Sequence, residues 1–80
     1  RQISIAPHSP AGPISSMAGV HIAATVPNFT LLEYGFGEVD WRTELTLPHE
    51  SVVDGYIEVP DRPGLGLDLD SEMIAKHRVA

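Results

Sequence analysis

The sequence predicts an α/β fold built around one strand-helix-strand unit, and three observations support this prediction. Residues 2–6 alternate polar and apolar side chains and end at Pro7, which is typical of a short strand. Residues 14–26 are mainly Ile, Met, Ala, Val and Ser, and they follow Pro13, a residue favoured in the first turn of a helix. Residues 29–32 form a continuous apolar run, as expected of a strand covered on both faces.

Proline and glycine mark the boundaries of these elements. Pro10, Gly12 and Pro13 keep the loop after the first strand out of regular structure, and residues 27–28 break the helix. Gly19 allows a neighbouring segment to approach the helix closely. Because the helix is mostly apolar, we expect it to be buried on most sides.

A histidine and a glutamate follow the two predicted strands, at the points where the strands end. His8 opens the loop after the first strand, and Glu33 comes directly after the second. A right-handed strand-helix-strand connection makes the strands parallel, so their carboxyl ends lie at one rim of the sheet. Adjacent strands are about 4.8 Å apart, and this rim is where α/β barrels and doubly wound sheets bind ligands. Both side chains are therefore candidates to contact one ligand.

Charged residues are distributed unevenly. Residues 2–32 contain no Lys, Arg, Asp or Glu, whereas all 11 acidic residues and all but one of the 5 basic residues lie from Glu33 onward. A free-standing small domain carries charge over most of its surface. A chain of 80 residues without cysteine buries only about 60% of its unfolded surface and has no disulfide to compensate. We therefore expect the chain to be a piece of a larger domain.

Composition also excludes several classes of partner. A net charge of −6 with 5 basic residues argues against nucleic acid, whose phosphates require clustered Lys and Arg. No apolar run approaches the roughly 20 residues of a membrane helix, and the first residues lack the apolar core of a signal peptide. The absence of cysteine fits a reducing compartment, and we expect a cytoplasmic location.

The part of the chain after Tyr34 has the character of a surface excursion. It begins with a Gly-rich acidic loop over residues 35–42 and continues to the Asp54-Gly55 pair, which predicts a hairpin turn. Residues 61–66 predict another turn. A short helix then ends at residues 76–78, and Asp70 or Ser71 can cap its start.

Other residues have simpler interpretations. His21, within the apolar helix, is expected to be a core or interface histidine, whereas His49 and His77 are expected to be exposed. The histidines lack the spacing of zinc ligands. Trp41 could reach over the site, but packing against the rim is the favoured role. Asp68, Asp70 and Glu72 resemble the start of a calcium-binding loop. The glycine and the final glutamate of such a loop are absent here, so capping of the following helix explains these residues better.

Several motifs in order resemble the carboxyl-terminal end of the mandelate racemase and muconate lactonising branch of the enolase superfamily. They are Ala6-Pro7-His8, Gly12-Pro13, the break at residues 27–28, Glu33, Asp54-Gly55 and Pro63-Gly64-Leu65-Gly66. Within this family, the chain is most similar to galactonate dehydratase-like acid-sugar dehydratases. The resemblance covers nearly the whole chain.

The resemblance implies a modified (β/α)7β barrel of the TIM type with an α+β capping domain. Residues 2–7 would be its seventh strand, residues 14–26 the following helix and residues 29–33 its eighth strand. The chain would divide into residues 1–50, the last barrel unit with its loop, and residues 51–80, an excursion that packs on the capping domain.

The resemblance also implies a chemistry. The family removes the proton α to a carboxylate, giving an enediolate, with Mg²⁺ as cofactor; in dehydratases a β-hydroxyl then leaves. His8 matches the family's general base, and Glu33 matches the glutamate that hydrogen-bonds the substrate carboxylate and stabilises the intermediate. The metal ligands and the general acid come from earlier strands in this family, so we expect no metal site in these residues and no turnover by this chain alone.

The implied partners are a small acid sugar, the rest of the chain's own barrel and capping domain, and further copies in a homo-oligomer. Two alternatives stay open. The net reaction could be racemisation or cycloisomerisation, since the same base and intermediate serve all three. The chain could also be a non-catalytic binding or structural module, in which His8 is an ordinary loop histidine and Glu33 a solvated carboxylate.

Overall fold

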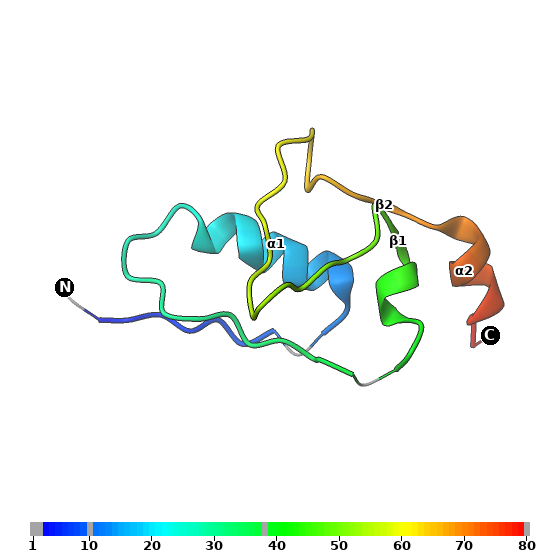
Figure 1. The fold of residues 1–80 in the computed structure, drawn as a ribbon, viewed down its shortest axis with the longest axis horizontal. Helices are drawn as coiled ribbons and strands as arrows, with labels where there is room; N and C mark the ends of the chain where they lie inside the picture. Colours follow the sequence, from blue (N-terminus) through cyan, green and yellow to red (C-terminus); the bar gives the residue numbers. More distant parts are fainter. Residues whose placement is uncertain (1–2, 10, 38, 80) are drawn as a thin grey trace.

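The computed structural model describes residues 3–9, 11–37 and 39–79 in a body that measures 46 × 26 × 26 Å. Gln2 and Pro10, which the sequence analysis places in the first strand and the following loop, lie outside the described residues. Helices and strands are few and short (Figure 1). In chain order they are α1 (Pro13–Ala23), the 3-10 turn η1 (Arg42–Glu44), β1 (Thr46–Leu47), β2 (Asp68–Leu69) and α2 (Ser71–Lys76).

Two extended segments, one on each side of α1 in the sequence, run side by side in the same direction (Figure 1). Ile5 and Phe29 form a parallel bridge. The amide of Thr30 donates to the carbonyl of Ile5 at 2.8 Å, and the amide of Glu33 donates to the carbonyl of Pro7 at 3.1 Å. The predicted parallel arrangement of two segments joined by a helix is therefore confirmed, but the two segments meet in an isolated bridge, and the described residues form no regular strand there.

Helix α1 begins as predicted, with Pro13 in its first turn, but ends at Ala23, three residues earlier than expected. The Thr25 hydroxyl donates to the carbonyl of Ile22 at 2.7 Å and occupies an acceptor at the end of the helix. Pro27 disfavours helical geometry at Val26. Together these residues stop the helix before the proline itself.

Burial of this unit is more one-sided than predicted. Within the described ranges, the buried hydrophobic side chains are Met17 and Val20, both on α1. Ile22 on the same helix is 61% exposed, and Leu31 in the second extended segment is 56% exposed. The expectations of a helix buried on most sides and a strand covered on both faces are therefore wrong for these residues. Both expectations assumed that other segments cover the helix and the strand on every side, whereas the described residues cover them on one side.

The remainder of the chain crosses α1 and returns to one end of the molecule (Figure 1). β1 and β2 pair antiparallel, with Thr46 opposite Leu69. The predicted Asp54-Gly55 turn is confirmed, since both residues have positive φ, 52° and 80°, and the flanking Val53 and Tyr56 form an antiparallel bridge.

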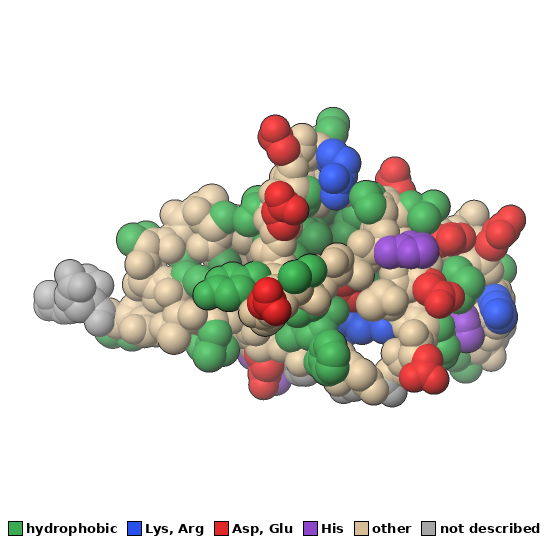
Figure 2. Space-filling model, viewed as in Figure 1, with side chains coloured by type: hydrophobic (Ala, Val, Ile, Leu, Met, Phe, Trp, Pro, Cys, Tyr) green, Lys and Arg blue, Asp and Glu red, His purple; other side chains and the backbone are tan. Residues whose placement is uncertain are grey.

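The charge asymmetry of the sequence is visible on the surface. Acidic and basic side chains cover the middle and the right of the view in Figure 2, while the described surface toward the N-terminal end is apolar or uncharged. Helix α2 carries part of this charge, and Asp70 caps it, as one of the two predicted caps. In the described part of the chain, neither helix has the length and apolar character that a bilayer crossing requires.

Candidate active site

His8 and Glu33, the two predicted site residues, are in direct contact. Nδ1 of His8 lies 2.5 Å from Oε1 of Glu33. The backbone sets this proximity, because the amide of Glu33 donates to the carbonyl of Pro7, the residue before His8. The side chains are 82% and 52% exposed, so the contact does not bury either group. The two residues thus share one rim and remain accessible to a ligand.

The geometry of this contact limits the chemistry of the pair. Imidazole has two nitrogens, and a proton on Nδ1 facing a carboxylate leaves the lone pair of Nε2 free to accept a proton. The second carboxyl oxygen of Glu33 is available for another hydrogen bond. The pair therefore offers a proton acceptor and a carboxyl group at neighbouring positions.

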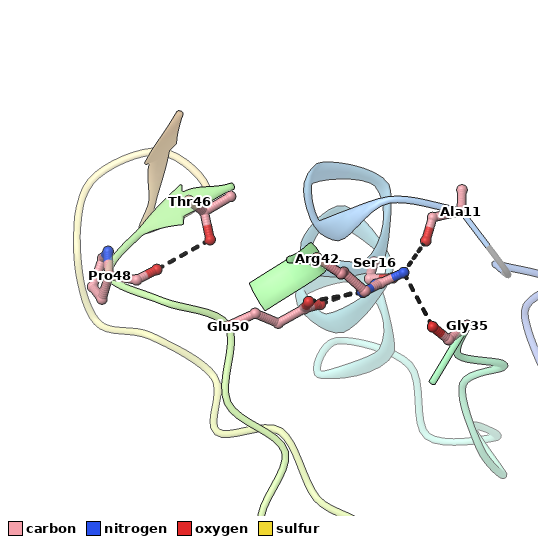
Figure 3. Close-up of polar contacts among 7 residues, drawn as sticks. All are labelled: Ala11, Ser16, Gly35, Arg42, Thr46, Pro48 and Glu50. Carbon is pink, nitrogen blue, oxygen red and sulfur yellow. Dashed lines mark hydrogen bonds and ion pairs between the residues drawn. The ribbon is translucent and has the colours of Figure 1, made fainter. Parts of the chain in front are cut away.

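Arg42 forms a buried polar cluster that the sequence analysis did not identify. Its Nε and Nη2 atoms donate to both carboxylate oxygens of Glu50, at 2.8 and 3.0 Å, and Nη2 also donates to the Ser16 hydroxyl at 3.0 Å (Figure 3). The side chains of Arg42 and Glu50 are 7% and 3% exposed. The interpretation of residues 35–50 as a surface excursion is therefore wrong at this pair, while the hairpin around Gly55 is exposed as expected.

Tyr34, directly after Glu33, completes this cluster. The guanidinium carbon of Arg42 lies 4.3 Å from the centroid of the Tyr34 ring, the geometry of a cation–π contact. Burial raises the pKa of Tyr34, and the Glu50 carboxylate raises it further. The hydrogen bonds to Glu50 raise the pKa of Arg42, which stays a cation.

The other histidines lie away from the pair. Nε2 of His21 is 2.9 Å from the carbonyl oxygen of Leu65, which agrees with an interface role. His49 is exposed, as predicted. His77 is half-buried and stacks on Trp41 with ring centroids 3.8 Å apart, so its predicted exposure is wrong. The stacked ring also gives Trp41 a packing role, in place of a position over the site.

No group of three or more potential metal ligands among His, Cys, Asp and Glu occurs in residues 3–9, 11–37 and 39–79. A groove of about 620 Å³, lined mostly by apolar side chains, lies between the end of α1, residues 29–32 and the hairpin around Tyr56. Its lining does not include His8 or Glu33, so we place the candidate chemistry at the rim and not in this groove.

Comparison with known proteins shows the family of the chain. The sequence pattern of the family described as "Enolase C-terminal domain-like" matches residues 1–73. The chain belongs to this family. A mandelate racemase/muconate lactonizing enzyme-like protein from Rubrobacter xylanophilus has a matching crystal structure, with a TM-score of 0.87 and 32% identity over 98% of this chain and 20% of that one. The resemblance stated from the motifs is thus confirmed.

Relatives in the enolase C-terminal domain-like family include acid-sugar dehydratases. A D-xylonate dehydratase of Haloferax volcanii is 36% identical over 96% of this chain and 19% of its own length. A D-galactonate dehydratase of Ralstonia nicotianae is 36% identical over 90% of this chain and 20% of its own length. The chain therefore spans about a fifth of the length of these relatives.

Proposed function

We propose that the chain is the terminal part of an acid-sugar dehydratase, which removes the proton α to a carboxylate and eliminates water. The observation that carries this proposal is the contact between His8 and Glu33 at the ends of two parallel segments. The names of the dehydratase relatives support the substrate class.

His8 is the proposed general base. With Nδ1 facing Glu33, Nε2 takes the α proton while the electron pair of the C–H bond moves into the enediolate of the substrate carboxylate. A positioned base of this kind contributes about 10²- to 10⁴-fold to the rate. The high exposure of the imidazole leaves room for a substrate to approach Nε2.

Glu33 is proposed to hydrogen-bond the substrate carboxylate. Its Oε1 faces His8, and its Oε2 is the atom assigned to the substrate. Negative charge grows on the substrate carboxylate as the α proton leaves, so a hydrogen bond between this carboxylate and the Glu33 carboxyl group stabilises the intermediate more than the starting acid sugar. In the second half of the reaction the β-hydroxyl leaves as water, after protonation by a group outside the described residues.

The intact enzyme is proposed to have the barrel and capping domain of the family, with the division at residues 50 and 51. Its magnesium, which would stabilise charge on the substrate carboxylate, is assigned to ligands outside the described residues. The exposed Ile22, Leu31 and Phe36 side chains are then covered by the rest of the barrel. Homo-oligomer formation and a cytoplasmic location stay predictions.

The test is dehydration of a panel of aldonates by the intact enzyme in the presence of Mg²⁺, followed as formation of the 2-keto-3-deoxy acid. His8→Asn is expected to lower kcat by about 10²- to 10⁴-fold. Glu33→Gln, which replaces the carboxyl group by an amide, is expected to lower it by about 10²-fold. His49→Asn, at an exposed histidine, is the control and is expected to match the wild type. Full activity of His8→Asn would refute the proposal, and an epimer formed without loss of water would redirect it to racemisation.

A further inference from the structure

We propose that Arg42 is a positioning residue that holds the loops carrying His8 and Glu33 in register. This inference rests on the proposed function of that pair. The guanidinium group of Arg42 makes hydrogen bonds to several parts of the chain. Its Nε and Nη2 atoms donate to Glu50, as described above. Its Nη1 atom donates to backbone carbonyls, and Nη2 also donates to a side chain of α1.

One backbone bond goes to the loop of His8. Nη1 of Arg42 donates to the carbonyl oxygen of Ala11 at 2.5 Å. Ala11 lies in the loop that His8 opens, just before α1. Nη2 reaches the first turns of α1 through the hydroxyl of Ser16. The guanidinium therefore fixes both the loop after the first extended segment and the helix that follows it (Figure 3).

The same cation also contacts the chain after Glu33. Nη1 lies 3.5 Å from the carbonyl oxygen of Gly35, a long hydrogen bond, and the guanidinium plane covers the ring of Tyr34. Tyr34 and Gly35 are the two residues that follow Glu33. One rigid, planar group thus joins the segments on both sides of the His8–Glu33 contact.

The energetics favour a positioning role over a purely stabilising one. Arg42 and Glu50 are both buried, and the cost of removing two charges from water is offset by their attraction only when the geometry is good. A buried ion pair is therefore weak evidence for added stability. The planar fork of arginine, in contrast, sets directions for several acceptors at once, which the point charge of lysine does not. Among the described residues, the hydrogen bonds of Arg42 go to neither His8 nor Glu33, so its effect passes through the backbone.

The test compares Arg42→Lys with Arg62→Lys in the intact enzyme. Arg62 also donates its Nε to a backbone carbonyl, that of Gly66 at 2.7 Å, but it does so in a turn away from the site. We expect Arg42→Lys to lower kcat by about 10- to 100-fold, since small misplacements of reacting groups have effects of this size. KM is expected to change less than about threefold, because the binding groups remain. Arg62→Lys is expected to keep the wild-type kcat and KM.

A structural readout separates this inference from the proposed function. Crystal structures of the wild-type and Arg42→Lys enzymes report the distance between Nδ1 of His8 and Oε1 of Glu33 whether or not an aldonate is turned over. The inference predicts that this contact lengthens or is lost in Arg42→Lys and persists in Arg62→Lys. A folded Arg42→Lys enzyme with an unchanged contact and with kcat within twofold of Arg62→Lys would overturn it.

A second variant decides the matter if Arg42→Lys does not fold. Glu50→Gln keeps the shape of the partner and one of its acceptor oxygens but removes the charge that anchors the guanidinium. It is expected to shift the same contact and to lower kcat in the same direction by a smaller factor. An unaltered contact and kcat in folded Glu50→Gln would count against the positioning role.

Discussion

The backbone amide of Glu33 donates to the carbonyl oxygen of Pro7, the residue directly before His8, at 3.1 Å. This one bond aligns the ends of the two extended segments, so that His8 and Glu33 leave the backbone at the same level. Their side chains then meet at 2.5 Å. The proximity of the candidate catalytic groups is therefore a consequence of strand register.

Helix α1 approaches the Leu32 side chain of the second extended segment closely at Gly19. A Cβ at this position would lie 2.9 Å from Cδ1 of Leu32. We expect Gly19→Leu to lower the free energy of unfolding of the intact enzyme by about 1–3 kcal/mol, because the added atoms force the helix and Leu32 apart. Gly12→Leu is the control, since a Cβ at Gly12 meets nothing within 4 Å. Urea denaturation measures both, and equal values for the two variants would refute this packing account.

Alkaline stability is expected to depend on Tyr34. Burial, reinforced by Glu50, raises its pKa in the folded protein above the ordinary value of about 10. The unfolded chain therefore releases this proton first, and its contribution to stability is fully present below pH 10 and is lost as pH rises from there through the folded-state pKa. Thermal unfolding between pH 8 and 11 should show a smaller alkaline loss in Tyr34→Phe than in the wild type.

The matched control for this pH experiment is Tyr56→Phe, at a ring that is 79% exposed. Its stability profile is expected to follow that of the wild type. If the Tyr34→Phe and Tyr56→Phe profiles coincide across the alkaline range, the raised pKa of Tyr34 has no part in alkaline unfolding.

Helix α2 is expected to depend on its cap. Oδ1 of Asp70 accepts hydrogen bonds from the amides of Glu72 at 3.0 Å and Met73 at 3.3 Å. Asp70→Ala should destabilise the helix by about 1 kcal/mol, whereas Asp70→Asn should retain most of the cap. Amide hydrogen exchange within α2 measures this locally. Asp68→Ala, at an exposed residue of β2, is the comparison, and equal exchange rates in Asp70→Ala and Asp68→Ala would exclude the capping role.

The features that the sequence predicted correctly depend on local rules. Apolar runs bounded by Pro7 and Pro27 predicted two parallel segments around a helix, and the register of such segments placed His8 beside Glu33. The positive φ angles required at Asp54 and Gly55 are typical of this residue pair in tight hairpins. Each of these inferences uses residues that are close in the sequence, together with the rule that strand-helix-strand crossovers are right-handed.

The features that the sequence did not predict depend on residues that are far apart in the chain. Arg42 is the last residue of the Gly-rich acidic loop, where a charged side chain is usually solvated, and its acceptors Ala11 and Ser16 lie far away in the sequence. His77 was expected to be exposed because its neighbours are polar, but the ring of Trp41 covers it. An arginine with a glutamate 8 residues later was the available sequence signal for the Arg42–Glu50 cluster.

The central claim is that His8 and Glu33 contact one ligand, and a crystal structure of the intact enzyme with a bound aldonate tests it most directly. The account predicts Nε2 of His8 facing the α carbon of the ligand, with Oε2 of Glu33 within hydrogen-bond distance of its carboxylate. A bound aldonate that contacts neither side chain, or a structure in which the two side chains point to opposite faces of the barrel, would contradict it.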